Sequence, residues 1–466
     1  LFRSGCLGSF RYFGMFYMEF IFVKREDKMK TKINHAWVLT MNQEFQMYRD
    51  GYVVIEDQKI VETGDGEGPS DVDQTVNAQG GILMPGMINT HSHISMIPFR
   101  SMGDDCPDRL RKFLFPLELE AMTPELVYRG ARYGICELLL SGVTTITDMY
   151  YFEEEVARAC EEMGIRAWVG QTVIDQPTCD AKDGREELAR CENFLKEWAG
   201  HDRIHPIVAP HATNTNPPEL LKEAYELAKK YQTLYTLHVS EMDYEMTMFR
   251  DKYGKTPIEF LYDLGVLGPD TLAVHCIHAT PNDVHLFAET GTKVAHCVGA
   301  NIKAGKGVAP VKEMLESGVV VGVGTDGPSS GNTLDLFTQF KMIAGLQKTH
   351  YHDRSAMPTQ SIVAMGTKGG ACALGAETEI GTIEVGKCAD LVLVETKSVN
   401  MFPVYNPYSA LVYSANASNV DKVWVNGRLL VDGHKLVNVS LDAEREALMH
   451  EMPAFVRQAE TYADVL

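Results

Sequence analysis

Residues 82–93 read ILMPGMINTHSH, an apolar run that ends in two histidines separated by one residue. An extended chain points residues i and i+2 to the same side, so the imidazoles of His91 and His93 can reach one metal ion. A histidine pair of this kind is common by chance, so its meaning depends on the residues at the ends of the other apolar runs. The stretch predicts a buried strand with metal-binding side chains near its carboxyl end.

Further apolar runs come later in the chain, and most of the gaps between them carry amphipathic segments long enough to be helices. This alternation is the pattern of βα units around a parallel sheet. Eight such units predict an α/β protein with a closed (β/α)8 TIM-like barrel, and an open doubly wound sheet is the alternative. The expected strands are residues 82–88, 143–147, 167–173, 205–209, 234–238, 272–276, 293–296 and 319–324. The expected helices are residues 124–140, 153–163, 185–198, 218–230, 256–264, 281–289 and 311–317.

Short strands at both ends of the chain predict a second, smaller domain. Residues 36–40, 52–56 and 59–62, and then residues 389–394, 420–425 and 429–431, are β-rich and lie between polar turns. We expect them to pair into one small β-sandwich domain built from both chain ends. The expected domains are residues 29–80 and 380–440 for the two parts of the sandwich, residues 81–379 for the barrel, and residues 441–466 for a C-terminal helical tail.

The first 28 residues do not fit this organisation. Residues 10–23 are rich in aromatic side chains but include Arg11 and Glu19, so they lack the uncharged apolar centre of a signal peptide. We expect residues 1–28 to be a non-native or disordered segment and Met29 to be the native start.

Composition narrows the classes of partner. The chain has 63 acidic and 43 basic residues and a formal net charge of −20, which repels nucleic acid and anionic membranes. Its ten cysteines are scattered without a CxxC pair, which predicts free thiols in a reducing compartment. No apolar run reaches the ~18 residues that a membrane span needs. We expect a cytoplasmic protein that binds a small molecule and water, and not nucleic acid or a membrane; a homo-oligomer remains open.

Three later strand ends carry the residue types that a metal site needs. His238 ends the fifth expected strand, His275 ends the sixth, and Asp326 follows the eighth. The carboxyl ends of barrel strands form the face on which barrel enzymes place their active sites. A buried carboxylate requires a strong partner, and a divalent metal ion is one. Core hydrogen bonds could explain any one of these residues, but they explain four imidazoles and a carboxylate on one face poorly.

With its flanking motifs, the chain resembles the amidohydrolase superfamily. The motifs are residues 84–93, residues 324–327 (GTDG) and residues 381–391 (GTIEVGKCADL). Within the superfamily, it is most similar to the group of 5-methylthioadenosine/S-adenosylhomocysteine deaminases, guanine deaminases and triazine hydrolases. The resemblance covers about residues 30–437, and its motifs are far more specific for the superfamily than for the substrate.

The resemblance implies one catalytic divalent metal ion per chain, Zn with Fe as the alternative. Its ligands would be the residues that match the family motif, with His275 beside the water that reacts. They are His91, His93, His238 and Asp326. No lysine ends the fourth expected strand, where residues 207–211 read IVAPH, so a bridge of carboxylated lysine between two metals is not expected.

Two more residues gain roles from the resemblance. Glu241 follows His238 by three residues, and the resemblance implies that it contacts the substrate and carries a proton between water and the ring. An exposed loop glutamate is the alternative interpretation. His211, at the end of the fourth strand, would donate a hydrogen bond to the substrate.

The sequence also departs from the family pattern. Residues 212–214 read ATN where relatives commonly have a small residue, proline and tyrosine, and Val298 and Ala300 replace a usual proline and serine. We expect Thr213, Asn214, Val298 and Ala300 to line or flank the substrate pocket. Residues 100–107 resemble the substrate loop after the first strand, but their Asp104-Asp105 pair is equally typical of a solvated turn.

These observations predict a hydrolase that acts on C–N bonds of cyclic amidines. We expect it to deaminate an aminated heterocycle and release ammonia, with adenosine thioethers such as 5-methylthioadenosine or S-adenosylhomocysteine as substrate. Asp326 and His275 would orient the water, and Glu241 would protonate the ring nitrogen and then the leaving amine. The alternatives are a triazine chlorohydrolase or aminohydrolase, a guanine, pterin or other purine deaminase and, more distantly, a non-catalytic binding module.

Overall fold

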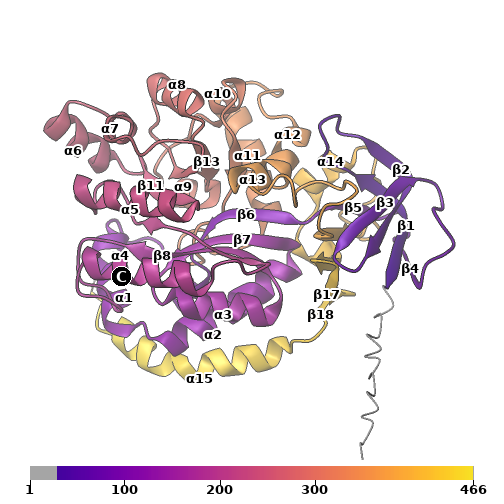
Figure 1. The fold of residues 1–466 in the computed structure, drawn as a ribbon, viewed down its shortest axis with the longest axis horizontal. Helices are drawn as coiled ribbons and strands as arrows, with labels where there is room; N and C mark the ends of the chain where they lie inside the picture. The colour runs from indigo at the N-terminus through magenta and orange to yellow at the C-terminus, as the bar shows by residue number, and fades with distance from the viewer. Residues whose placement is uncertain (1–28, 465–466) are drawn as a thin grey trace, which may run out of the picture.

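The computed structural model describes residues 29–464 and contains two sheets that lie side by side (Figure 1). The first is a parallel barrel surrounded by helices. Its strands are β6 (Met87–Ser92), β7 (Val143–Tyr150), β8 (Arg166–Val173), β9 (Ile204–Pro206), β10 (Ala209–Pro210), β11 (Tyr235–Val239), β12 (Thr271–His275), β13 (Lys293–His296) and β14 (Val321–Val323). The strands β9 and β10 together fill the fourth of eight positions.

The barrel is closed: its last strand pairs with its first, and its fourth position is joined to its fifth. Val323 of β14 pairs with Asn89 of β6, and the parallel bridge between Val208 and Tyr235 links the fourth position to β11. Closure leaves no edge strand and gathers all eight carboxyl ends on one face. The predicted barrel is therefore confirmed, and the open doubly wound alternative is wrong.

The helices cover the outside of the barrel. Among the longer ones are α1 (Phe115–Ala121), α2 (Pro124–Leu140), α3 (Glu153–Met163), α4 (Gly184–Glu197), α5 (Pro218–Tyr231), α6 (Asp243–Tyr253), α7 (Pro257–Leu264), α8 (Pro281–Thr290), α11 (Leu336–His350) and α15 (Leu441–Glu460). The shorter ones are α9 (Val298–Lys303), α10 (Val311–Glu316), α12 (Thr359–Met365), α13 (Lys368–Ala373), α14 (Pro407–Ser409), η1 (Ile94–Phe99), η2 (Leu110–Leu114), η3 (Ala410–Ser414) and η4 (Ala417–Asn419).

Local sequence explains where several helices begin. Thr123, Thr256 and Thr280 each accept a hydrogen bond from the third residue of the helix that begins after them, and proline occupies the first helical position in each case. The hydroxyl satisfies an amide that has no partner within the helix, and proline has no amide to satisfy. The last helix, α15, runs along α2 (Figure 1), where Arg132 pairs with Glu444 at 2.6 Å.

The second sheet combines strands from both chain ends, as predicted. Its order is β18-β17-β16-β15-β5-β1-β2-β3, and β4 also pairs with β1. The strands are β1 (Lys30–Leu39), β2 (Met47–Glu56), β3 (Lys59–Asp65), β4 (Gln74–Asn77), β5 (Ile82–Pro85), β15 (Leu391–Val394), β16 (Val420–Val425), β17 (Arg428–Asp432) and β18 (Lys435–Leu436). The domain boundaries given above stay a prediction.

One expected strand is divided between the two sheets in the structure. Residues 82–88 are not one barrel strand: β5 pairs with β15 in the second sheet, and β6 begins the barrel at Met87. The chain changes sheets at Gly86, where a Cβ atom would lie 2.1 Å from the Thr144 hydroxyl oxygen. Only glycine permits that approach.

An ion pair fixes the two sheets together. Arg166, the first residue of β8, donates from Nε to Asp390 Oδ2 at 2.8 Å, and both side chains are almost completely buried. Asp390 Oδ1 also accepts from the backbone amide of Asn426, at the turn between β16 and β17, at 2.6 Å. We call these three residues the seam.

Three observations complete the fold. The nine cysteines from Cys106 to Cys388 are free thiols. Between residues 29 and 464, no helix is both long and apolar enough to cross a membrane. The prediction about residues 1–28 lies outside the described residues.

Candidate metal centre and substrate cavity

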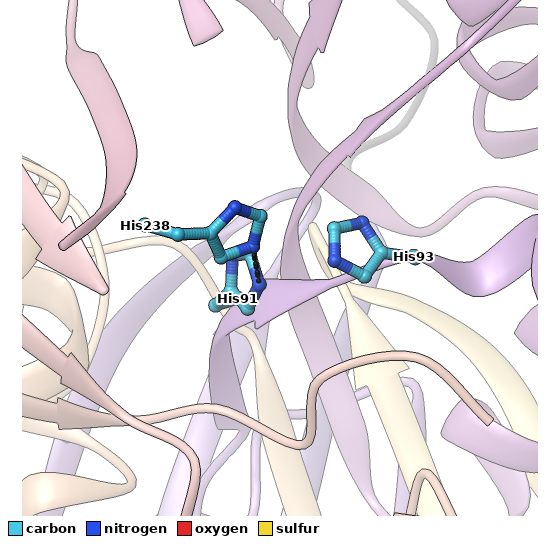
Figure 2. A group of neighbouring side chains, drawn as sticks. All are labelled: His91, His93 and His238. Atoms are coloured by element: carbon cyan, nitrogen blue, oxygen red, sulfur yellow. Dashed lines mark hydrogen bonds between the residues drawn. The ribbon is translucent and has the colours of Figure 1, made fainter. Parts of the chain in front are cut away.

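Four histidines and one aspartate meet at the carboxyl ends of the barrel strands. His91 lies in β6, His93 directly after it, His238 in β11, His275 at the end of β12, and Asp326 shortly after β14. Figure 2 shows the rings of His91, His93 and His238 around a common space. The Nε2 atoms of His91 and His238 lie 3.2 Å apart, and His93 Nε2 lies 3.1 Å from Asp326 Oδ1.

Backbone carbonyls set the orientation of two of these rings. His93 Nδ1 lies 2.5 Å from the carbonyl oxygen of Met149, and His238 Nδ1 lies 2.6 Å from that of His211. Because a carbonyl oxygen only accepts, each Nδ1 must carry a proton, and each Nε2 is the nitrogen left for a metal ion. Metal-binding histidines are typically fixed in this way.

The charges fit a cation. Burial lowers the pKa of His91 to about 4 and that of His238 well below its ordinary value, so both rings are neutral. Burial alone would raise the pKa of Asp326, but its interactions with the rings of His91 and His93 hold it well below its usual range, so the side chain is a carboxylate. Despite its burial, the carboxylate of Asp326 raises the pKa of His93 to about 9, so a bound ion would take the place of the His93 proton. Imidazole nitrogens and one carboxylate are the donor set that a divalent transition metal binds.

The ligand atoms lie close enough for one ion. Those of His91, His93 and His238 lie within 4.8 Å of one another, as do those of His91, His275 and Asp326. The site therefore has the geometry and the donor set for a divalent metal ion. Nδ1 of His91 is buried and has no partner among the described residues, so nothing prevents its Nε2 from presenting a lone pair.

The backbone is strained where it places two of these side chains. His275 has φ of 69° and Asp326 has φ of 59°, values in the left-handed region that residues other than glycine rarely adopt. Such a conformation costs about 1–3 kcal/mol and persists only where the surroundings impose it. Asn89 helps to impose it at Asp326, because its amide oxygen accepts from the amide of Thr325 at 3.1 Å.

A cavity of about 430 Å³ opens beside this cluster. Pockets for small organic ligands range from about 300 to 1,000 Å³, so the size suits a molecule such as a nucleoside. His93, His238, His275 and Asp326 border it on one side. Its remaining lining includes Arg109, Glu118, Tyr150, His211, Glu241 and Lys306.

Glu241 lies between two cationic or potentially cationic groups in this cavity. Its Oε1 lies 3.6 Å from His275 Nε2 and forms an ion pair with the ammonium of Lys306. Burial alone would raise the pKa of Glu241, but His275 and Lys306 lower it to about 2. The side chain is an anion inside the cavity and not a solvated loop residue.

The other predicted residues have mixed outcomes. His211 lines the cavity, and its Nδ1 lies 3.0 Å from the Thr215 hydroxyl. Of the four positions at which the sequence departs from the family, Ala300 lines the cavity and Val298 does not. Thr213 and Asn214 do not line it either.

Both of these residues instead hold the segment around Glu241. Thr213 donates to the carboxylate of Glu245, which also accepts from the backbone amides of Ser240 and Glu241. Asn214 donates to the hydroxyl of Tyr244.

The loop at residues 100–107 is held in place across the cavity. Asp104 and Asp105 lie in an exposed turn, as the solvated-turn interpretation expects, and Asp104 also accepts from Lys303 Nζ at 2.7 Å and from Asn332 Nδ2 at 2.8 Å. Asp105 lines the cavity.

Several functional candidates escaped the sequence analysis. Lys306 and Tyr150 line the cavity, and Asn301 accepts at 2.9 Å from His275 Nδ1. The signal for Lys306 was available: it is a lysine between two glycines that comes after the seventh strand on the active-site face.

Known proteins share this architecture. The model of the amidohydrolase family matches residues 82–430. A 5′-deoxyadenosine deaminase from Methanosarcina barkeri is 37% identical over 417 residues, which are 89% of this chain and 95% of that protein. A 5-methylthioadenosine/S-adenosylhomocysteine deaminase from Caldanaerobacter subterraneus subsp. tengcongensis is 40% identical over 375 residues, 80% of this chain and 86% of that protein. The crystal structure of an adenosine deaminase from Xanthomonas campestris with bound zinc superposes with a TM-score of 0.88 at 30% identity and covers 92% of this chain and 99% of that one.

Proposed function

The chain belongs to the amidohydrolase family, and we propose that it is a metal-dependent deaminase of adenine nucleosides altered at the 5′ position, with 5-methylthioadenosine and S-adenosylhomocysteine as preferred substrates. It is a hydrolase of C–N bonds in cyclic amidines. One observation carries the proposal: three of the four proposed metal ligands, a further histidine and a buried glutamate line a single cavity of nucleoside size, and the fourth proposed ligand lies beside them.

His91, His93, His238 and Asp326 would hold one divalent ion per chain, Zn with Fe as the alternative. The zinc bound by the Xanthomonas relative supports this assignment. When bound, such an ion lowers the pKa of water from 15.7 towards about 7 and so supplies a strong nucleophile at neutral pH. The Asp326 carboxylate would accept a hydrogen bond from the reacting water and orient it.

His275 would contact the water through Nε2. Its Nδ1 donates to the amide oxygen of Asn301 at 2.9 Å, which leaves Nε2 to face the cavity beside Glu241. His211 is placed to contact the substrate through Nε2, because its Nδ1 lies 3.0 Å from the Thr215 hydroxyl. Nε2 would donate to the substrate when the Thr215 hydroxyl donates to Nδ1 and not to the carbonyl of Ala212. Burial lowers the pKa of His211 to about 4, so the ring is neutral.

Glu241 moves the protons. Water adds to the ring carbon that bears the amine, and Glu241 accepts the proton that the water loses. Glu241 passes this proton to the adjacent ring nitrogen. It then takes the proton of the newly added hydroxyl and delivers it to the amine, so that a carbonyl forms, the C–N bond breaks and ammonia departs. Positioned general acid–base catalysis of this kind typically contributes about 10²–10⁴-fold.

The charge and the thiols of the protein bear on its partners and its location. The net charge of −20 supports a partner list of a small heterocycle and water, without nucleic acid or membrane. A cytoplasmic location fits the free thiols of the described cysteines.

An ammonia-release assay tests the substrate. The purified, metal-loaded protein would be compared on 5-methylthioadenosine, S-adenosylhomocysteine, 5′-deoxyadenosine, guanine, a pterin and a chlorotriazine, the last also assayed for chloride. A site built around one heterocycle can reject another by about 10⁴-fold, so a clear preference is expected. We expect kcat/KM to be largest for one of the two thioethers. A larger value for guanine, the pterin or the triazine would overturn the substrate assignment, and no turnover of any compound would overturn the proposed function.

A further inference from the structure

Lys306 lines the catalytic cavity and lies in a tight turn between two glycines. It lies between Gly305, with φ of 64°, and Gly307, with φ of 122°. Both values are in the region that favours glycine, so the sequence GKG permits a tight turn that other residues would resist. The backbone amide of Lys306 donates to the carbonyl of Asn301 at 3.0 Å. Asn301 thus anchors Lys306 through its backbone and orients His275 through its side chain.

The ammonium of Lys306 has three N–H donors but bonds to a single side chain among the described residues. Between residues 29 and 464, the ammonium of Lys306 contacts only Glu241, through Oε1. By contrast, the nearby Lys303 is saturated by oxygens of Asp104, Ser329 and Asn332. Lys306 and Glu241 both line the cavity, and each side chain retains about a sixth of its exposure, at 18% and 17%.

The pair leaves one carboxylate oxygen available. Oε1 of Glu241 is shared by Lys306 and, at 3.6 Å, by His275, whereas Oε2 has no partner in the described part of the chain. A carboxylate that shuttles a proton needs one free oxygen in a fixed direction, because a misplacement of about 1 Å can cost about 10²-fold in rate. A cation on the opposite oxygen provides that restraint.

We propose that Lys306 is a positioning residue for proton transfer: its ammonium holds Oε1 of Glu241 so that Oε2 is the oxygen that serves the water and the substrate. This inference rests on the proposed function. It also explains why a lysine is placed in a cavity that already contains a metal-binding centre, since Asp326 and Glu241 would otherwise be two anions facing each other. The ionisable groups that interact with Glu241 are Lys306, His275, Asp326, His211, Tyr244, Glu245 and Cys297.

The test compares Lys306→Met, which removes the charge, with Lys306→Arg, which keeps it. We expect Lys306→Met to lower kcat by about 10- to 100-fold, with KM within about threefold of wild type and metal content unchanged. Without the cation the pKa of Glu241 rises, so the acid limb of the pH profile of kcat/KM should move to higher pH by about one unit. Lys306→Arg should recover most of the rate and the wild-type profile.

Lys312→Met is the matched control. Lys312 pairs with Glu316 at 2.7 Å on α10, outside the cavity, and its loss should change neither kcat nor the pH profile. Two results would overturn the inference: wild-type kcat and pH profile in Lys306→Met, or equal losses in Lys306→Met and Lys306→Arg. Should the methionine variant fail to fold, Lys306→Gln tests the same loss of charge.

A crystal structure of Lys306→Met keeps the inference separate from the proposed function. If wild type releases no ammonia from any compound, the proposed function fails, but the position of Glu241 can still be compared between variant and wild type. We expect the carboxylate to rotate away from its wild-type position. An unchanged Glu241 would overturn the positioning role without bearing on the substrate.

Discussion

The seam and the cavity each contain a buried ion pair, and the two pairs are built differently. In the seam, the guanidinium of Arg166 bonds to both oxygens of Asp390 and to the carbonyl of Asp202, and Asp390 also accepts from Asn426. In the cavity, Lys306 and Glu241 have each other, and the second oxygen of Glu241 has no protein partner among residues 29–464.

This difference separates a structural pair from a working one. A buried charge costs free energy unless its hydrogen bonds are satisfied, and the seam satisfies them within the protein. The cavity leaves bonds unsatisfied at the point where water and substrate would enter. We therefore expect changes in the cavity to affect turnover with little effect on stability, and changes in the seam to do the reverse.

The largest expected effect is that of Asp326→Ala in the cavity. This change removes a proposed metal ligand and the group that orients the water, so kcat should fall by at least about 10³-fold and bound metal should be lost. Metal analysis and the ammonia assay measure both quantities, and Asp251→Ala, at an exposed position on α6, serves as the control. A variant that keeps both metal and turnover would remove Asp326 from the site, and a wild-type stoichiometry near two would contradict the mononuclear centre.

Glu241→Gln should separate proton transfer from metal binding. Glutamine keeps the shape of the side chain but cannot carry the proton, so kcat should fall by at least about 10²-fold while metal content and the Tm stay near wild type. Full turnover in the variant would show that Glu241 does not carry the proton. Equal loss of metal and rate would make Glu241 a ligand.

Arg166→Met tests the seam. It leaves the carboxylate of Asp390 buried beside an apolar side chain, and breaking a buried pair in this way costs about 3 kcal/mol of the free energy of unfolding. Denaturant unfolding measures the loss, with Arg445→Met as the control because Arg445 is half exposed. At a temperature where the variant is folded, kcat should equal that of wild type. Unchanged stability would show that the seam does not hold the two sheets together.

Much of this arrangement could be predicted from the sequence because its signals are local. The period of the apolar runs located seven of the eight barrel positions and the first residues of the remaining strand, β6, and residues 293–296 and 124–140 match β13 and α2 at both ends. His91, His93, His238 and Asp326 stood out because such residues rarely end buried strands together. Each of these signals lies within a few neighbouring residues.

The features that the sequence did not reveal depend on contacts between distant segments. The change of sheet at Gly86 depends on Thr144, and the division of the fourth strand depends on how it meets β11. The position of Lys306 depends on Glu241, 65 residues earlier. Thr213 and Asn214 were expected at the pocket because they come shortly after His211, but the chain turns there and uses them to hold the segment around Glu241.

Glu187 is a third buried ionisable side chain, and among the described residues no cation is bonded to it. Its replacement is expected to have the smallest effect of the changes compared in the cavity, in the seam and at this site. The carboxylate accepts from Gln171 Nε2 at 2.8 Å and from Thr178 Oγ1 at 2.7 Å, beside the buried Asp180. Burial, together with the charge of Asp180, raises the pKa of Glu187 to about 8. The folded state therefore holds a proton that the unfolded state releases near its ordinary pKa, and stability is lost as pH rises from that value to about 8.

Glu187→Gln mimics the protonated side chain and removes this loss. The Tm of the variant relative to wild type should rise by a few degrees between about pH 5 and pH 8 and stay constant above, since each pKa unit is worth about 1.4 kcal/mol at most. Thermal unfolding at a series of pH values measures the gap, and Glu197→Gln, at the exposed end of the same helix, should show none. A gap that is flat or narrows with pH would mean that Glu187 is ionised in the folded protein and that a buried carboxylate here needs no cation at all.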